Sequence, residues 1–465
     1  VIYHQLSELA ESVGGVVLED DNLLEEVTNL VETPTAVLCS FEKRYLTLPQ
    51  ELLVAVMQKH QRYFPILDSR GRITSNFITV RNGGRENIEI VRQGNEAVIK
   101  ARYADAQYFY NRDCRTTLGS FRVKLKTLVF QEQLGSMADK SDRLVILAPW
   151  LADFFMLPND EMDDLVRAAY LCKADLATNL VVEMTSLQGV MGREYARRSG
   201  ESSAVALAIM EHYLPRYAED ALPTSNPGIV LALADRMDNL AGLFAVGLEP
   251  TGSTDPYGLR RDAASIIRLL QAQEMPFPLR PALEKAGAGL PVEMSPSALE
   301  HVIDFVKTRL RVSLRDEGFA FDVVEAVLAF WGDNPYVARE LAQQLSLWVE
   351  MDNWPNLLQN YARCVRITRD ITSYPLNSAY LTEPAERDLW QKLQELNSQL
   401  SVRDKDNINT LLEQFTPMVP LIEKFFNEVM VMVDDVPVRQ ARLALLLNIA
   451  ELPVGLVDLS QLESF

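Results

Sequence analysis

Two aspartates on apolar segments are the residues of this sequence with the clearest potential for hydrolytic chemistry. Asp175 lies in LCKADLATN (171–179), and Asp235 lies in LALADRMDNL (231–240). Paired carboxylates can hold a divalent metal, which lowers the pKa of a bound water until it attacks a phosphoester near neutral pH. Such a centre also needs two or three imidazoles. The 465-residue chain has four histidines: His4, His60, His212 and His301.

Both segments resemble the metal-binding helices of HD-type phosphohydrolases, but the set of ligands is incomplete. Where that family would have adjacent His and Asp ligands, Lys173 and Ala174 precede Asp175. The first ligand position, in GSMADKSDRLVILA, falls at about Ser141, which is a poor metal ligand. We expect none of the four histidines at a ligand position. Only the carboxylates of Asp175 and Asp235 then remain.

The role of this remnant is open at the level of sequence. Lys173, Asp175, Asp235 and Arg236 can form a buried polar network that ties two helices together, or they can contact phosphate or RNA. A bare pair of oxygen ligands binds a divalent cation weakly. We therefore expect neither a metal site nor a catalytic residue in this chain. The alternative function is that of an independent HD-type phosphohydrolase with a degenerate metal site.

Cations and aromatic rings gather in the segment MQKHQRYFPILD. Lys59, His60 and Arg62 precede Tyr63 and Phe64. Such a mixture suits contact with an RNA backbone and stacking on bases. We therefore take the three polar residues as candidates for tRNA binding, although a domain interface would show the same composition.

The segment EPTGSTDPYGLRRDA (249–263) offers a second candidate for anion binding. Asp255 and Pro256 predict the start of a helix whose first turn leads to Arg260 and Arg261. Free backbone N–H groups and two guanidinium groups can then converge on a phosphate. The alternative is a capped helix with solvated arginines.

Composition limits how the chain can meet nucleic acid or a membrane. The net charge of −19 argues against bulk attraction to nucleic acid, so contact must come from particular faces, such as the cations between Arg102 and Lys126. We find no run of eighteen apolar residues, and we expect no membrane role. The four cysteines are far apart and form no CxxC pair, which favours a reducing, cytoplasmic location.

The pattern of apolar residues predicts a short α/β region followed by helices. TAVLCSF predicts a strand, Pro49 opens a predicted helix, and residues 62–80 predict a hairpin around the turn DSRG. From Asn95 onward the spacing is helical. The Pro- and Gly-rich residues 274–297 predict a linker between helical domains. Near the C-terminus one helix is expected to bury a single face: Ile422, Phe425, Val429 and Met432.

Six segments in order resemble the β subunit of the bacterial, heterotetrameric type of glycyl-tRNA synthetase. They run across nearly the whole chain: LTLPQELLVAVMQKHQRYFPILD, GNEAVIKARYADAQYFYNRD, LVFQEQLGSMADKSDRL, CKADLATNLVVEMTSLQGVMGREYA, LALADRMDNLAGLFAVGLEPTGSTDPYGLRRDA and FFNEVMVMVDDVPVRQARLALL. The β subunit of that family is longer at its N-terminus. The chain, which starts at Val1 without a leader, is therefore expected to be its C-terminal two-thirds.

The resemblance implies a mainly α, multidomain fold. Residues 1–115 would form an α/β region, and residues 116–275 a degenerate HD-type helical domain. A helical linker region would follow at 276–345. A helical anticodon-binding domain would occupy 346–465, with NLLQNYARCVRITRD near its start.

The resemblance also implies the function of a tRNA-binding subunit of a glycine-tRNA ligase. Such a subunit recognises and positions glycine tRNA, while the α subunit carries out ATP-dependent glycylation. We therefore expect no cofactor in this chain, and ATP and Mg at the α subunit. The expected partners are glycine tRNA and the α subunit, in an α2β2 assembly or a fused α-β chain. A pure scaffold for the α subunit is a further possibility.

Site residues follow from the resemblance at three places. For contact with the tRNA backbone, the candidates are Arg260 and Arg261. Around the HD remnant, the candidates are Lys173, Asp175, Gln188, Arg193, Asp235 and Arg236. At the anticodon end, they are Tyr361, Arg363, Arg366 and Arg369. On a helix, arginines three residues apart share a face, so these last three arginines would project together.

Overall fold

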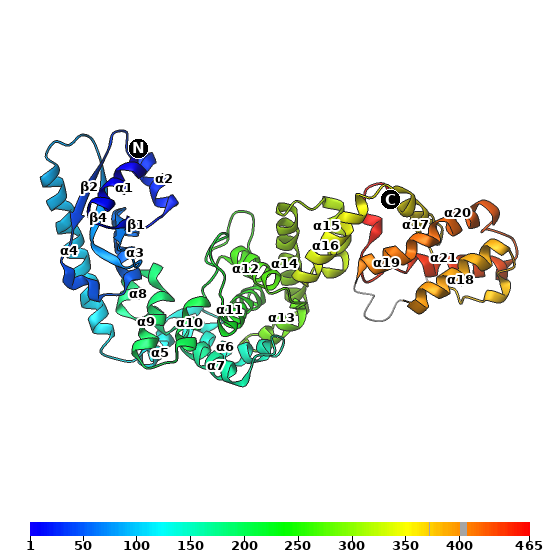
Figure 1. The fold of residues 1–465 in the computed structure, drawn as a ribbon. Coiled ribbons are helices and arrows are strands. Elements are labelled where there is room, and N and C mark those ends of the chain that lie inside the picture. Colours follow the sequence, from blue (N-terminus) through cyan, green and yellow to red (C-terminus); the bar gives the residue numbers. More distant parts are fainter. Residues whose placement is uncertain (372, 400–406) are drawn as a thin grey trace. The chain divides into compact units, whose positions relative to one another are not determined.

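The structure is a computed structural model that describes residues 1–371, 373–399 and 407–465 (Figure 1). These residues form two compact units. The first comprises Val1–Arg216 and Asp220–Asp235, and the second comprises Tyr217–Glu219 and Arg236–Phe465. Helices dominate, and the named strands all lie in the first unit, which confirms a mainly α, multidomain fold with an N-terminal α/β region. The finer division into four domains stays a prediction.

The first unit opens with an antiparallel sheet of four strands in the order β1-β3-β4-β2. The strands are β1 (Val16–Val17), β2 (Pro34–Ser40), β3 (Phe64–Leu67) and β4 (Ile73–Asn82). The predicted strand TAVLCSF falls largely in β2. The predicted hairpin is β3–β4, and Gly71 N donates to Asp68 O at 2.9 Å to close its turn. Both predictions are confirmed.

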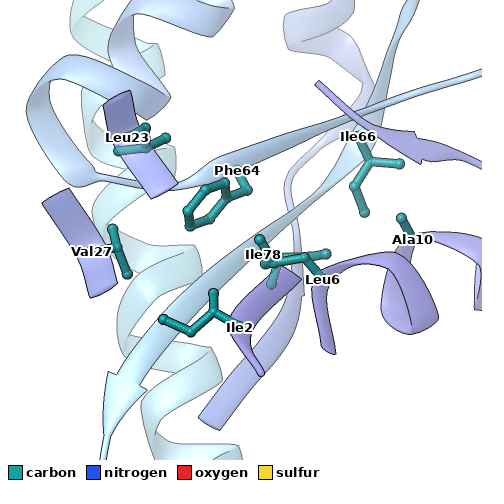
Figure 2. Packing of buried hydrophobic residues seen from close by; sticks show 8 residues of the cluster. All are labelled: Ile2, Leu6, Ala10, Leu23, Val27, Phe64, Ile66 and Ile78. Carbon is teal, nitrogen blue, oxygen red and sulfur yellow. The ribbon is translucent and has the colours of Figure 1, made fainter. Parts of the chain in front are cut away.

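One face of this sheet is covered by two helices, α1 (Ile2–Ser12) and α2 (Asp21–Leu30). Figure 2 shows their side chains meeting those of β3 and β4 in one apolar cluster. Asp20 begins α2, because its carboxylate accepts the N–H of Leu23 at 2.9 Å. The buried members of the cluster are Ile2, Leu6, Ala10, Leu23, Val27, Phe64, Ile66 and Ile78.

The opposite face carries α3 (Gln50–Gln61) and α4 (Ile88–Asp113). Successive strand residues point to opposite faces, so Phe77 lies on the side away from Ile78. Its ring stacks on that of Tyr63 at 4.8 Å between centroids. The helical spacing predicted from Asn95 onward is confirmed, since α4 buries Ile99, Tyr103, Ala106 and Tyr110.

The remainder of the first unit is a set of short helices and turns, among which α6 packs on α7 and α10 packs on α7 and α9 (Figure 1). A two-stranded hairpin, β5 (Val129–Gln131) and β6 (Gly135–Ser136), precedes α6. The helices are α5 (Leu118–Arg122), α6 (Met137–Ala152), α7 (Asn159–Leu171), α8 (Asn179–Glu183), α9 (Val190–Arg198), α10 (Ser203–Glu211) and α11 (Asn226–Ala245). The 3-10 turns are η1 (Lys43–Thr47), η2 (Val123–Thr127), η3 (Ala174–Ala177) and η4 (Thr185–Leu187).

The second unit is helical. Its helices are the end of α11, then α12 (Leu259–Ala272), α13 (Leu279–Ala288), α14 (Pro296–Asp316), α15 (Phe321–Trp331), α16 (Pro335–Val349), α17 (Trp354–Thr368), α18 (Pro384–Gln399), α19 (Ile408–Phe415), α20 (Val419–Glu428) and α21 (Val436–Ala450). Short 3-10 turns are η5 (Ser378–Tyr380), η7 (Thr416–Met418) and η8 (Leu459–Gln461). Among the described residues, the helices are all too short or too polar to cross a membrane.

Two local predictions in this unit are wrong. Residues 274–297 are not a simple linker, because α13 forms inside them and buries Leu279 and Leu283. The predicted helical face near the C-terminus ends early, because α20 stops at Glu428 and Met432 is 63% exposed. Buried and exposed residues alternate along the stretch VMVM. A period of two is typical of an extended chain and not of a helix.

Asp113, the last residue of α4, ties the α/β region to the helical part of the first unit. Its buried carboxylate accepts the backbone N–H groups of Asn179 at 3.0 Å and Leu180 at 2.9 Å, which open α8. The hydroxyl of Tyr195 in α9 also donates to it, at 3.1 Å. One side chain therefore satisfies donors from two other helices.

We predict that Asp113→Ala lowers the free energy of unfolding by about 2–4 kcal/mol, since several buried donors lose their acceptor. Asp105 is exposed on the same helix, and we expect Asp105→Ala to change that free energy by less than about 0.5 kcal/mol. Urea unfolding followed by circular dichroism measures both. Equal effects of the two substitutions would contradict this role of Asp113.

Candidate functional site

A buried network of charged side chains lies in the first unit, at the segments where the sequence predicted an HD remnant. Lys140 comes from α6, Lys173 follows α7, and Asp235 comes from α11. The Asp235 carboxylate receives Lys173 Nζ at 2.8 Å on Oδ2, and Lys140 Nζ lies 3.1 Å from Oδ1. Lys140 Nζ also donates to the carbonyl of Asp235 at 3.2 Å. The three residues are 2–7% exposed, so these charges interact away from bulk water.

Local sequence explains why the lysines reach this point. Ser136 begins α6 with a capping box, in which its backbone N–H donates to the Asp139 carboxylate at 2.7 Å. That cap fixes the first turn, where Lys140 points inward. Lys173 stands where α7 has ended and the short turn η3 begins, so its side chain leaves the end of one helix toward another.

His212 completes the network beside Lys173. Its Nδ1 lies 2.7 Å from the carbonyl of Ile209, which can only accept, so Nδ1 carries the proton. Nε2 is then an acceptor for the Lys173 ammonium at 3.0 Å. The Lys173 Nζ also lies 4.5 Å from the centre of the Tyr213 ring, a cation–π distance. The ammonium thus meets a carboxylate, an imidazole and a ring.

Electrostatics keep Asp235 ionised in this buried place. Burial by itself would raise the pKa of Asp235, but the positive charges of Lys140 and Lys173, with His212 nearby, hold that pKa well below its ordinary value of 3.8. A buried carboxylate between two ammonium groups is the arrangement that offsets its loss of hydration.

The fold brings together residues that the sequence did not group. His212 enters the network from the end of α10, where it contacts Lys173 and not a metal site. We placed the first ligand position at Ser141, whereas the neighbouring Lys140 faces Asp235. Ser141 instead donates its hydroxyl to the carbonyl of Ala169 at 2.9 Å. Successive residues of a helix point in different directions, so a shift of one position changes which side chain faces inward.

The donors around Asp235 do not fit a divalent metal. A protonated lysine has no lone pair to offer, and its charge repels a cation. Lys140 and Lys173 stand on both oxygens of the Asp235 carboxylate, at the distances given above. Among the residues that the structure describes, no group of three or more His, Cys, Asp or Glu side chains is arranged to hold a metal ion. The geometry favours the interpretation as a buried polar network.

Asp175 is buried nearby but has a different role. Its Oδ2 accepts the N–H of Gly189 at 2.5 Å, which braces the turn before α9. Gly189 has φ of +77°, which a residue with a side chain adopts only with strain. A Cβ at Gly192 would lie 3.0 Å from the same oxygen, so the turn packs tightly on the carboxyl group. Burial raises the pKa of Asp175 to about 6, although Gly189 and Lys173 act against this rise.

The other residues assigned to the remnant are Arg193, Gln188 and Arg236. The Arg193 guanidinium pairs with Glu51 of α3, and its Nη1 lies 3.0 Å from the sulfur of Met210. It therefore links α9 to the α/β region. Gln188 is half-buried in the turn before α9, and Arg236 is buried in α11.

The N-terminal candidates for RNA contact divide by burial. Lys59 is exposed on α3. Arg62 ends that helix in the left-handed conformation and pairs with Glu26 at 2.6 Å. Tyr63 and Phe64 are core residues, and the Tyr63 hydroxyl donates to Asn95 Oδ1 at 2.6 Å, so these rings are not exposed for base stacking. The side chain of His60 lies outside the described part of the chain.

The start of α12 is capped rather than open. The Asp255 carboxylate accepts the N–H groups of Leu259 at 2.8 Å and Arg260 at 2.9 Å. Of the two possibilities that the sequence left open, the structure shows the capped helix at these two positions. The Arg260 guanidinium donates to the carbonyl of Gly252 at 2.7 Å, which braces the loop. Arg261 is exposed and remains a candidate for phosphate contact.

The candidates on α17 separate into one core residue and three arginines. Tyr361 is buried, and its hydroxyl donates to the carbonyl of Ala450 at 2.8 Å. Its assignment to tRNA binding is not retained, since this hydroxyl is committed within the fold. Arg363 stacks over the Phe426 ring at 4.2 Å. Arg366 is exposed, 5.8 Å from the centre of the Phe465 ring, and Arg369 is exposed at the helix end.

Sequence reasoning missed Lys140 and His212. His212 follows the apolar stretch AVALAIM, so its burial could have been inferred, and a buried ionisable group needs a partner. Lys140 is flanked by Asp139, Ser141 and Asp142, so the local sequence carries no signal of its burial. In neither case does the local sequence say which helix supplies the partner.

We predict opposite outcomes for one substitution at the two aspartates. Asp235→Asn removes the countercharge of two buried ammonium groups, and should lower the free energy of unfolding by about 3–5 kcal/mol. Asp175→Asn keeps an oxygen for Gly189 and mimics the protonated carboxyl group favoured by burial. It should raise the free energy of unfolding at pH 8 by roughly 1–3 kcal/mol.

The pH dependence provides a second check. Since the folded pKa of Asp175, about 6, lies above its ordinary 3.8, the folded state binds the proton more tightly. The stabilisation from that proton is present below pH 4 and is lost as pH rises through 6. The advantage of Asp175→Asn over the wild type should therefore grow between pH 4 and 7 in thermal unfolding. A pH-independent difference would contradict this assignment.

Comparisons with known proteins indicate the same family as the six sequence segments that resemble a glycyl-tRNA synthetase β subunit. A family model described as glycyl-tRNA synthetase beta subunit matches residues 1–329, and one described as DALR anticodon binding domain matches residues 357–453. The glycine–tRNA ligase beta subunits of Desulforamulus reducens and Clostridioides difficile are each 39% identical to the chain. Both alignments cover 99% of this chain and 67% of the relative.

A plant relative is similar over the same span. The chloroplastic/mitochondrial glycine–tRNA ligase 2 of Arabidopsis thaliana is 39% identical over 472 residues, covering 100% of this chain and 44% of that protein. The chain thus spans about two thirds of the bacterial relatives and less than half of the plant one. Because the first family model matches well over half of its residues, the chain belongs to the glycyl-tRNA synthetase beta subunit family.

Proposed function

We propose that this chain binds glycine tRNA and positions it for ATP-dependent glycylation by an active site on a partner α subunit. The relatives at 39% identity are named as glycine–tRNA ligases, and the two bacterial ones as beta subunits. The match to an anticodon-binding domain over residues 357–453 adds the expected RNA-binding module. The chain is then one part of an aminoacyl-tRNA synthetase.

The observation that carries this proposal is an arginine row along α17 and at its C-terminal end, inside the anticodon-binding match. Arg363, Arg366 and Arg369 follow one another at a spacing of three residues, and the last two are exposed. Arginine can pair with phosphate and stack on bases. In a chain with a net charge of −19, such a local row supplies the attraction that the whole protein lacks.

The partner and the reactants follow from the division of labour in such an enzyme. The name beta subunit implies an α subunit, which would hold ATP and Mg and form the bond to glycine. An α2β2 assembly and a fused α-β chain both suit this role. We place the reaction in the cytoplasm, with which four free cysteines are compatible.

The alternative of an independent phosphohydrolase has less support. The ammonium groups of Lys140 and Lys173 pair with the Asp235 carboxylate, where such an enzyme would need its metal. The family models describe a synthetase subunit and an anticodon-binding domain instead. We assign the remnant a structural role, in which the ion pairs hold α6, α7 and α11 together.

We predict that Arg366→Gln combined with Arg369→Gln weakens binding of glycine tRNA and leaves the fold intact. Each lost phosphate contact should lower the slope of log affinity against log salt by about 0.7–0.9. Filter binding at several salt concentrations measures this slope. Arg70→Gln combined with Arg85→Gln removes the same two charges at other exposed arginines and serves as the control. A normal slope in the double variant would remove these arginines from the interface.

A further inference from the structure

The strand β1 forms one edge of the four-stranded sheet, and its outer side pairs with no strand among the described residues. On the inner side Val17 is the partner of Ile66, and Leu18 N donates to Pro65 O at 2.9 Å. Neighbouring residues of an antiparallel strand direct their N–H and C=O groups to opposite sides. Because the N–H of Leu18 bonds to β3, Val17 directs its backbone groups to the outer side.

A hollow of about 490 Å³ lies along this edge, between α1 and α2. Its most buried lining residues are apolar: Leu6, Ala10 and Phe64 are each 1–2% exposed, and Figure 2 shows them in the apolar cluster of the sheet. Tyr3 and Val16 also line the hollow, but they are 57% and 60% exposed. A side chain that enters the hollow would remove this apolar surface from water.

Local hydrogen bonds fix the walls of the hollow. Gly14 follows α1 with φ of +73°, and its N–H donates to Glu11 O at 2.9 Å, which turns the chain into β1. The cap at Asp20 then begins α2. Apart from Phe64, the lining residues all come from residues 3–24. The hollow is therefore built by one continuous segment and belongs to the first unit alone.

The charges around the hollow select the kind of partner. Its lining residues include Glu11, Glu19, Asp20 and Asp21, and none of the described lining residues is a lysine or an arginine. Residues 1–42 hold nine carboxylates and no lysine or arginine, in a chain that has 45 of these cations. Such a field repels phosphate groups and attracts cationic side chains. A basic peptide fits this surface, and a nucleic acid does not.

We propose that the outer edge of β1 and the adjoining hollow are a docking site for a basic, extended segment of a partner protein. The segment lies along β1, with backbone hydrogen bonds at Val17 and an apolar side chain in the hollow. Its lysine or arginine side chains face Glu19 and Asp21. Extended peptides bind exposed sheet edges in this manner, with main-chain bonds for affinity and alternate side chains for specificity. The proposal goes beyond tRNA binding and does not depend on it.

The first test compares synthetic peptides on the full chain by fluorescence anisotropy. The probe has about eight residues that alternate lysine and valine, a usual length for a strand. A lysine–serine peptide carries the same charge without an apolar side chain, and we expect it to bind about tenfold more weakly. Methylation of the backbone nitrogens of the lysine–valine peptide removes its hydrogen-bond donors, and should also weaken binding about tenfold.

The second test changes the protein. Tyr3→Ser should weaken binding of the lysine–valine peptide about threefold to tenfold, since it removes apolar surface at the hollow. Tyr108→Ser, at a tyrosine that is 62% exposed on α4, should leave the affinity unchanged. Thermal unfolding confirms that both variants fold.

The third test separates a local site from the general acidity of the chain. Glu19→Gln with Asp21→Asn should weaken binding of the lysine–valine peptide about tenfold. Glu350→Gln with Asp352→Asn removes two exposed carboxylates in the second unit and should have little effect. Equal losses in the two double variants, equal binding of the lysine–valine and lysine–serine peptides, or no binding by the wild type would each overturn the proposal.

Discussion

The helical part of the first unit depends on one buried carboxylate between two ammonium groups. Asp235 cannot be buried alone, because the loss of hydration would favour its neutral form. Lys140 and Lys173 would be equally costly without it. Each charge therefore requires the other two, and their distances of 2.8 and 3.1 Å hold α6, the end of α7 and α11 in one arrangement.

The same interaction occupies the place where two sequence segments suggested a metal centre. In a metal centre, carboxylates and imidazoles would share a divalent cation. Here the positive charge is supplied covalently, by lysine side chains, and His212 accepts a hydrogen bond from one of them. The charge balance of the helical core is kept without a metal.

A second buried pair works in a comparable way in the other unit. Glu386 and Arg442 are both buried, and the remaining donors of Arg442 are directed at the carbonyl of Met430. The pair secures α18 and α21, and it also sets the direction of the loop between α20 and α21. In both units a costly internal charge pair stabilises one backbone path.

Sequence alone determined the family, the mainly helical fold, the hairpin at β3–β4 and the segments that carry Asp175 and Asp235. These follow from short-range patterns, since apolar period, turn residues and motif order are all local. The tertiary structure decided which ionisable groups meet. Lys140 faces Asp235 and Ser141 does not, His212 arrives from another helix, and Tyr63, Phe64 and Tyr361 turn inward. The physical reason is that burial and pairing depend on helix rotation and on contacts far apart in the chain. A hundred degrees of rotation per residue separates a core side chain from a surface one.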